Sequence, residues 1–270
     1  MQHTVLLTAP YMMSSVERFR KVIEGYYGIK MIVPKVQQKL NEEEILSYAG
    51  QFDGTICGDD VYSERVIQGC LPRLKVISKW GTGIDAIDKP AAIRLGVVVG
   101  NTLNAFTIPV SETAIGYMLS FVRGLQSMNI SMHEGIWNKP PITTLSECTV
   151  GIVGVGNIGQ AIVRRIHPFG CKILVNDIAP IKPDFLIEHR IEAVDLKTLL
   201  EQSDIVTMHT DLNPTSRHLI NAETLSYMKP TALLINTSRG PVVDETALAE
   251  ALQAKQIGGA ALDVFEVEPL

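Results

Sequence analysis

Residues 149–159 read TVGIVGVGNIG, and this stretch decides the fold of the second half of the chain. The apolar run 149–153 is typical of a buried strand, and the G-x-G-x-x-G pattern at 154–159 follows it directly. In the next segment apolar residues recur at helical spacing, at Ile158, Ile162, Ile166 and Phe169. Gly170 is the expected end of this helix. A strand, a glycine turn and a helix in this order predict a dinucleotide-binding unit of the Rossmann type.

Each glycine of this pattern has a physical role in binding a dinucleotide. Gly154 permits the tight turn, Gly156 lets a pyrophosphate approach the backbone, and Gly159 allows the helix to pack closely on the strand. The helix that begins around Asn157 and Ile158 offers backbone N–H groups and the positive end of its dipole to the pyrophosphate. We therefore expect these five positions to bind a cofactor.

Asp177 lies at the end of the next expected strand, where a carboxylate can accept hydrogen bonds from an adenosine ribose. Its charge repels the extra phosphate of NADP, and residues 178–180 contain no arginine that would bind this phosphate. The structural alternative, a plain turn followed by a solvent-facing aspartate, explains fewer of these features. The sequence therefore predicts a site for NAD.

Composition and charge argue against several other functions. The chain has 270 residues, of which 46% are hydrophobic and 20% charged, as in a soluble globular protein with a sizeable core. A net charge of −5 argues against a nucleic-acid partner, and no apolar run is long enough to cross a membrane. The four cysteines are scattered, and the N-terminus lacks a signal-peptide pattern. We therefore expect a cytoplasmic protein.

Strand-like runs alternate with segments of helical length, which predicts an α/β fold with parallel sheets. The expected strands are 4–8, 29–33, 54–57, 75–78, 97–99, 149–153, 172–176, 205–209, 232–236 and 259–264. Asn41, Asp195 and Asn221 are expected helix caps. One helix is expected at 14–26, and the long segment 110–131 is expected to form a helix that links two lobes.

Four stretches carry a resemblance to a known family, the D-isomer-specific 2-hydroxyacid dehydrogenases, which include phosphoglycerate, glyoxylate or hydroxypyruvate, and D-lactate dehydrogenases. They are KVISKWGTGIDAID (75–88), NTLNAFTIPVSE (101–112), INTSRGPVVDETAL (235–248) and GAALDVFEVEP (259–269). The resemblance covers nearly the whole chain, and its last two stretches are the most specific. It implies a flavodoxin-like substrate domain at residues 1–100 and a Rossmann NAD-binding domain at residues 101–270.

The family resemblance also implies an activity and the residues that perform it. The expected activity is hydride transfer between nicotinamide and C2 of a D-2-hydroxy acid, of the 3-phosphoglycerate or glyoxylate/hydroxypyruvate type. Arg239 matches the arginine that binds the substrate carboxylate, which a planar guanidinium can hold at two points. The stretch Gly81, Thr82 and Gly83 matches a loop whose backbone N–H groups hold the same carboxylate. Without the resemblance, Arg239 could form a surface ion pair, and residues 81–83 could form a plain turn.

Other positions match residues around the reacting atoms. Thr237 and Ser238 match positions beside the cofactor, and Asp263 matches one near the nicotinamide carboxamide. Glu268 matches the acid that pairs with the catalytic histidine, because a neighbouring carboxylate favours the imidazolium form. In the family that histidine lies beyond this acid, and the sequence ends at Leu270. We therefore expect the 270-residue chain itself to be inactive.

Two further groups of polar residues bear on metals and on the substrate. The spacing of His209, Asp211 and His218 fits no metal-ligand pattern, so no metal is expected. Gly58 stands where many phosphoglycerate dehydrogenases carry an arginine, and Asp59 and Asp60 follow it. Two acids repel a phosphate, so 3-phosphoglycerate is favoured as the substrate by its frequency in the family and disfavoured by charge.

Two alternative functions use the same NAD site. One is a non-catalytic NAD-sensing regulatory protein of the same fold, and the other is an NAD-dependent enzyme of another reaction class. Both keep the glycine turn and Asp177, whereas only a dehydrogenase needs Arg239 and Glu268 together with the histidine. A homodimer is expected from the resemblance and from the apolar segment 110–131, with a small 2-hydroxy or 2-oxo acid as the other partner.

Overall fold

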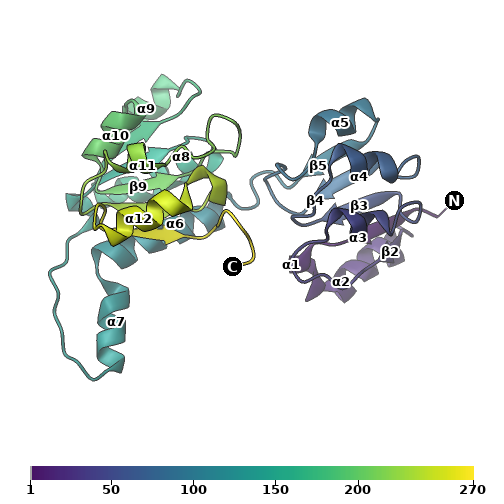
Figure 1. The fold of residues 1–270 in the computed structure, drawn as a ribbon, viewed down its shortest axis with the longest axis horizontal. Coiled ribbons are helices and arrows are strands. Elements are labelled where there is room, and N and C mark those ends of the chain that lie inside the picture. Colours follow the sequence, from purple (N-terminus) through teal and green to yellow (C-terminus); the bar gives the residue numbers. More distant parts are fainter. Residues whose placement is uncertain (1) are drawn as a thin grey trace. The chain divides into compact units, whose positions relative to one another are not determined.

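The computed structural model describes residues 2–270 as two compact α/β units (Figure 1). The first unit ends at Phe106, beyond the boundary expected at residue 100, and the second spans Thr107–Leu270. Met1, the first residue of the expected substrate domain, lies outside the described residues. Within residues 2–270 no helix is both long and apolar enough to cross a membrane.

The first unit is built on one parallel sheet of five strands, with helices on both faces. The strand order β2-β1-β3-β4-β5 is the flavodoxin-like order, as the family resemblance implied. The strands are β1 (Thr4–Leu7), β2 (Lys30–Ile32), β3 (Gly54–Cys57), β4 (Val76–Lys79) and β5 (Val98–Asn101). One face packs on α3 (Glu42–Leu46), α4 (Glu64–Gly69) and α5 (Lys89–Arg94), and the other on α1 (Pro10–Met13), α2 (Val16–Arg20) and η1 (Lys21–Tyr26).

The second unit is built on a parallel sheet of six strands in the order β11-β10-β9-β6-β7-β8, which is the Rossmann order. Its strands are β6 (Thr149–Val153), β7 (Lys172–Asn176), β8 (Glu192–Ala193), β9 (Ile205–Met208), β10 (Leu233–Asn236) and β11 (Gly259–Leu262). One face packs on α6 (Thr107–Val122), α8 (Asn157–Ile166) and α9 (Pro183–His189), and the other on α10 (Leu196–Gln202), α11 (Ala222–Leu225) and α12 (Glu245–Gln253). The short turns η2 (Leu145–Glu147), η3 (His167–Phe169) and η4 (Gly240–Val242) complete the unit.

The three expected helix caps are confirmed. Asn41 accepts a hydrogen bond from the backbone N–H of Glu44 at the start of α3, and Asp195 caps α10 in the same way. The side chain of Asn221 accepts from two backbone N–H groups at the start of α11. Short side chains with an acceptor oxygen occupy these positions because the first N–H groups of a helix have no partner within it.

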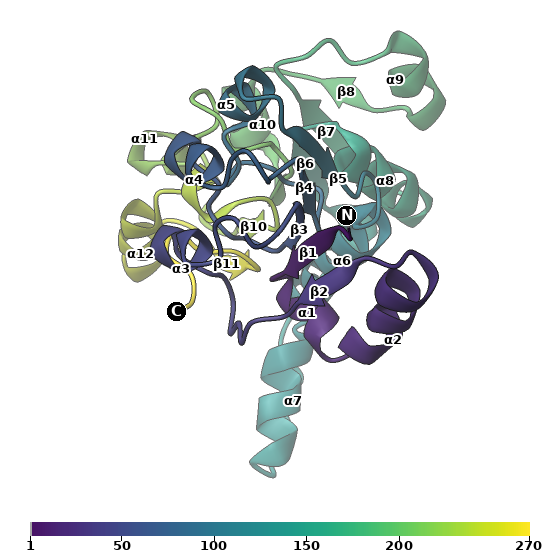
Figure 2. The same ribbon diagram turned by 90° about the vertical axis from the view of Figure 1, so that its right-hand side faces the viewer.

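Two expected helices are wrong in extent. Segment 14–26 forms α2 followed by the π-helical turn η1, not one α-helix. Segment 110–131 breaks at Gly124, whose φ of 57° is a left-handed conformation that glycine adopts without a steric cost. After this break α7 (Leu125–His133) leaves the direction of α6 and projects away from the sheet of its unit (Figures 1 and 2).

Close backbone contacts shape the turn between β6 and α8. A Cβ atom on Gly159 would lie 2.1 Å from the carbonyl oxygen of Gly154, so that no side chain fits there. Gly154 has a φ of 92°, and a Cβ atom on it would lie 2.5 Å from the carbonyl oxygen of His209. Gly116, at an exposed position inside α6, is the opposite case, because its Cβ would meet no atom within 4 Å.

These contacts predict opposite effects of the same substitution at two glycines. Gly159→Ala should lower the free energy of unfolding by about 1–3 kcal/mol, because a backbone carbonyl cannot move away as a flexible side chain could. Gly116→Ala should leave it unchanged or raise it by up to about 1 kcal/mol, since alanine favours a helix. Urea unfolding followed by circular dichroism measures both. Equal stability of the two variants would contradict the packing described for the turn.

Candidate functional site

The residues expected to bind NAD follow the carboxyl ends of parallel strands in the second unit. The glycine turn 154–159 follows β6, Asp177 follows β7, the run 237–239 follows β10, and Asp263 follows β11. Because the strands are parallel, these segments lie along one edge of the sheet. The strand order reverses between β6 and β9, and ligands of such folds bind outside the carboxyl ends of the strands at this point.

A pocket of about 200 Å³ opens at this reversal of strand order. Gly154, Gly156 and Asp177 line it together with residues of the loop that follows β9. Apart from the adjoining backbone, no atom of residues 2–270 lies within 4 Å of the place where a Cβ on Gly156 would stand, so a ligand can approach the backbone there. Of the expected cofactor residues, Asn157, Ile158, Gly159, Thr237, Ser238 and Asp263 do not line this pocket.

The first turn of α8 suits an anionic group. The helix has ten residues, and its N-cap, Gly156, makes no side-chain capping bond. The positive end of the helix dipole is therefore not neutralised by a capping side chain and lies beside the pocket that Gly156 lines. Ile158 packs against the core and Gly159 against Gly154, so these two residues hold the helix on the sheet.

The Asp177 carboxylate is held in place by two backbone N–H groups. Val155 donates to Oδ2 over 2.6 Å, and Ala179 donates to Oδ1 over 2.8 Å. A carboxylate has about four lone-pair positions, so two acceptor positions are left for ribose hydroxyls. The bond from Val155 also links this carboxylate to the glycine turn, so that the two halves of the expected NAD site are positioned together.

The loop after β9 supplies a part of the pocket that lies outside the residues assigned to the cofactor. His209 Nε2 lies 2.7 Å from Thr207 Oγ1, while His209 Nδ1 and Thr210 Oγ1 are buried and lack a partner within residues 2–270. Burial lowers the pKa of His209 to about 3, so the ring is neutral at neutral pH. Buried polar atoms without a partner are typical of sites that a bound group or water completes. The donors and acceptors around this pocket therefore fit NAD.

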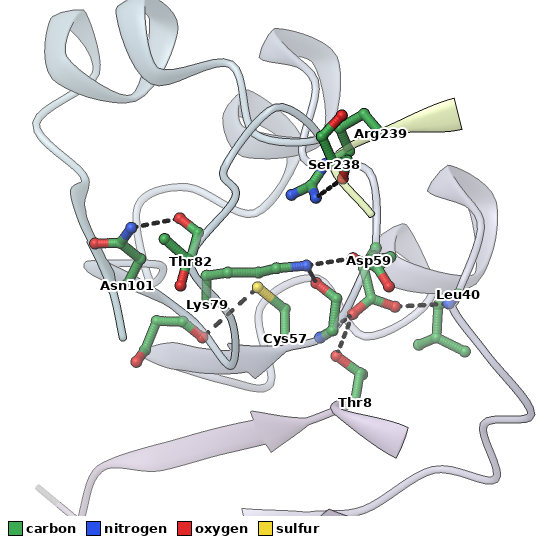
Figure 3. Close-up of polar contacts among 12 residues, drawn as sticks. Thr8, Leu40, Cys57, Asp59, Lys79, Thr82, Asn101, Ser238 and Arg239 are labelled. Carbon is green, nitrogen blue, oxygen red and sulfur yellow. Dashed lines mark hydrogen bonds and ion pairs between the residues drawn. The ribbon is translucent and has the colours of Figure 1, made fainter. Parts of the chain in front are cut away.

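The turn that carries Arg239 is shaped by Asn236, a buried residue that the sequence did not single out. Its Oδ1 accepts from the backbone N–H and the hydroxyl of Ser238 over 3.1 and 2.8 Å, and its Nδ2 donates to the carbonyl of Arg239 over 2.9 Å. Arg239 Nη1 in turn donates to the carbonyl of Ser238 (Figure 3). Thr237 is buried beside them, 6% exposed.

The last residues of the chain lie against the same turn. A Cβ on Gly240 would overlap the backbone of Phe265, which shows how closely the two segments pack. Asp263 donates its backbone N–H to the carbonyl of Asn236, and Glu268 accepts from the backbone N–H of Phe265 over 2.8 Å. The carboxylate of Glu268 is exposed. Across residues 2–270 no group of three or more His, Cys, Asp or Glu side chains is placed to hold a metal ion.

In the first unit the loop 81–83 follows β4 and is fixed to the end of β5. Asn101 Nδ2 donates to the carbonyl of Thr82 over 2.6 Å (Figure 3). Thr82 Oγ1 donates to the carbonyl of Thr102. Thr102 also donates its backbone N–H to the carbonyl of Gly81 over 3.0 Å. These bonds define the conformation of the loop that the resemblance assigned to the substrate carboxylate.

The neighbouring loop after β3 is organised by Asp60, whose side chain is fully buried. It accepts from Thr8 Oγ1 over 2.6 Å, from the backbone N–H of Leu40 over 2.6 Å and from that of Gly58 over 3.0 Å (Figure 3). Burial raises the pKa of this carboxyl, while the three hydrogen bonds lower it. Asp60 is therefore a structural acid, and only Asp59 of the two adjacent acids is exposed.

Comparison with known proteins identifies the family. Residues 115–270 match the family described as "D-isomer specific 2-hydroxyacid dehydrogenase, NAD binding domain". A glyoxylate reductase from Thermofilum pendens is 41% identical over 236 residues, which cover 85% of this chain and 70% of that protein. A D-3-phosphoglycerate dehydrogenase from Synechocystis is 38% identical over 243 residues, but this chain spans only 43% of its length.

Solved structures agree with this match. The D-lactate dehydrogenase from Aquifex aeolicus, complexed with NAD and lactic acid, has a TM-score of 0.86 and 25% sequence identity, covering 98% of this chain and 77% of that one. A protein from Thermus thermophilus, TT0316, has a TM-score of 0.84 and 30% identity, covering 99% and 83%. The chain therefore belongs to the D-isomer-specific 2-hydroxyacid dehydrogenase family, with NAD as its cofactor.

Proposed function

We propose that this chain forms the substrate domain (residues 1–100) and the NAD-binding domain (residues 101–270) of an NAD-dependent D-2-hydroxyacid dehydrogenase. The observation that carries the proposal is the single sheet edge of the second unit that brings together the glycine turn, Asp177 and the Arg239 turn. The reaction is a reversible hydride transfer between C2 of a small 2-hydroxy acid and nicotinamide. Relatives named glyoxylate reductase, hydroxypyruvate reductase and D-3-phosphoglycerate dehydrogenase support it.

The residues of the second unit bind and orient the reactants. NAD, when bound, supplies or accepts the hydride. The backbone of residues 154–159 and the first turn of α8 hold the pyrophosphate, and Asp177 holds the ribose. Thr237 and Ser238 lie on the turn assigned to the nicotinamide end, and Asp263 follows the adjacent strand.

The substrate is held through its charged end. The Arg239 guanidinium binds the carboxylate and steadies the C2 oxygen, so the developing charge on that oxygen is stabilised in the transition state. In the first unit, the backbone N–H groups of Gly81, Thr82 and Gly83 are assigned to a substrate carboxylate. Glu268 favours the protonated form of the histidine that the family uses as its acid and base.

A non-catalytic NAD-sensing protein needs the pocket but neither Arg239 nor Glu268. No feature of the structure favours it. The defined turn around Arg239, in which Asn236 makes three hydrogen bonds, is better explained by a role in holding a substrate. Burial of Asn236 adds to the cost of leaving any of these bonds unmade.

A homodimer is supported by α7 and the segment after it. This helix has no buried residue, although apolar side chains lie along and just after it. The exposed ones are Leu125, Ile130, Met132, Ile136 and Trp137, and Trp137 is 78% exposed. Exposed apolar groups of this density mark interaction surfaces, and two copies of the same face can cover each other. A cytoplasmic location is supported by the four cysteines, which are all free.

Cofactor preference tests the role of Asp177. The protein should bind NADH at least about tenfold more tightly than NADPH, because the carboxylate repels a second phosphate. Asp177→Asn keeps one acceptor oxygen and should reduce the ratio of the two affinities toward one. Asp184→Asn, an equal change of charge on exposed α9, should leave the ratio unchanged. Titrations followed by nicotinamide fluorescence measure the ratios. Tighter binding of NADPH by the unmodified protein would contradict the assignment.

Steady-state kinetics test the role of Arg239 in a form of the protein that oxidises NADH. Arg239→Ala should lower kcat/KM for a 2-oxo acid at least about a hundredfold, because a carboxylate clamp contributes on the order of 3 kcal/mol. The affinity for NADH should change little. Arg164→Ala, at the exposed end of α8, is the matched control. An Arg239→Ala variant with unchanged kinetics would remove the arginine from the mechanism.

The dimer is tested by sedimentation equilibrium at micromolar concentration. The unmodified protein should sediment as a dimer, and the double variant Ile130→Glu, Trp137→Glu should sediment as a monomer, because two buried charges per copy would oppose association. Ile187→Glu, at a side chain that is 75% exposed on α9, should remain dimeric. If the unmodified protein is monomeric, the proposed role of α7 is wrong.

A further inference from the structure

Lys79, the last residue of β4, is a buried cation at the carboxyl edge of the first sheet. Its side chain is 7% exposed. Nζ donates to the carbonyl oxygen of Gly58 and to Asp59 Oδ1, each over 2.5 Å (Figure 3). An ammonium group has three N–H bonds, and these two contacts are its only hydrogen bonds to residues 2–270. Lys79 therefore has one N–H left for another acceptor.

The side chain of Lys79 connects two neighbouring loops. A Cβ atom on Gly81 would lie 3.0 Å from Lys79 Cε, so the aliphatic part of the lysine packs against this glycine. The ammonium end lies at Gly58 and Asp59, because β3 and β4 are adjacent parallel strands. The cation is thus placed beside the loop 81–83, which the proposed function assigns to the substrate carboxylate.

Asp59 supplies an acceptor next to this donor. Its side chain is 60% exposed, whereas the oxygens of Asp60 are committed to Thr8, Leu40 and Gly58. A hydroxyl group both donates and accepts hydrogen bonds. One hydroxyl can therefore donate a hydrogen bond to a carboxylate and accept a hydrogen bond from an ammonium group beside it.

The charge of the same loops is unsuited to a phosphate. Segments 58–60 and 79–83 contain one lysine, two aspartates and no arginine. A phosphate ester carries about −1.5 to −2 charges at pH 7 and is bound by an excess of positive charge. The charge of Lys79 is already balanced by Asp59, with which it forms an ion pair.

We propose that Asp59 and Lys79 select the C3 substituent of the substrate, and that the 2-oxo acid carries an uncharged hydroxyl there in preference to a phosphate. Asp59 accepts the hydrogen bond of this hydroxyl, and the remaining N–H of Lys79 donates to its oxygen. The proposal rests on the proposed function and adds the substrate class to it.

Binding of three 2-oxo acids in the presence of NADH tests the pair. Glyoxylate has no C3, hydroxypyruvate has a C3 hydroxyl, and 3-phosphohydroxypyruvate has a C3 phosphate. Trp80 lies between Lys79 and Gly81 and contacts Phe19, so its fluorescence can report on the loop. Trp137→Phe removes the other of the two tryptophans, and calorimetry provides a second measurement.

The unmodified protein should bind hydroxypyruvate at least about tenfold more tightly than 3-phosphohydroxypyruvate. Asp59→Asn removes a charge at an exposed position and should shift this ratio about tenfold toward the phosphorylated acid. Lys79→Met should weaken hydroxypyruvate binding about tenfold and leave glyoxylate binding nearly unchanged. Glu17→Gln, on exposed α2 of the same unit, should leave all ratios unchanged.

Tighter binding of the phosphorylated acid by the unmodified protein, or an unchanged ratio in Asp59→Asn, would overturn the proposal. If Lys79→Met lowers the affinities for glyoxylate and hydroxypyruvate equally, the lysine binds the carboxylate and not the C3 group. Failure of all three acids to bind would count against the proposed function itself. Binding of the acids without discrimination at C3 would count against the Asp59–Lys79 pair alone.

Discussion

The contact between Gly159 and the carbonyl oxygen of Gly154 is the constraint on which the second unit depends. It lets the first turn of α8 lie directly on the end of β6, with no side chain between them. The same approach places the helix dipole beside the pocket and brings the N–H of Val155 to Asp177. A larger residue at Gly159 would separate helix and strand, and the residues proposed to bind the pyrophosphate and the ribose would then no longer be positioned together.

Local patterns in the sequence were sufficient to predict most of the fold, because buried parallel strands form short apolar runs and several helices begin after an Asn or Asp cap. The two-residue strand β8 carries no such run, since both of its residues are exposed. The break at Gly124 was missed because an isolated glycine in an apolar segment is also compatible with a continuous helix. Segment 14–26 shows the same limit, since a single π-helical turn that directly continues an α-helix alters the apolar spacing over only a few residues.

The place of the candidate residues in the fold was predictable where one motif contains all of them, since residues 154–159 and 237–239 do follow the strands β6 and β10. It was not predictable where distant segments meet. Lys79 is a single lysine in a strand, and only the pairing of β3 with β4 brings it to Asp59. The loop that begins at His209 lies at the reversal of strand order and directly follows a fully buried strand, which is the signal that marks it in the sequence.

The three bonds of Asp60 have a consequence for the dynamics of the first unit. They join Thr8 after β1, Leu40 before α3 and Gly58 after β3 through one acceptor side chain. Such a shared acceptor makes their local opening cooperative, so the amide hydrogens of Leu40 and Gly58 should exchange with solvent at similar rates in one sub-global event. A single carboxylate thereby couples the motions of three loops that are far apart in the sequence.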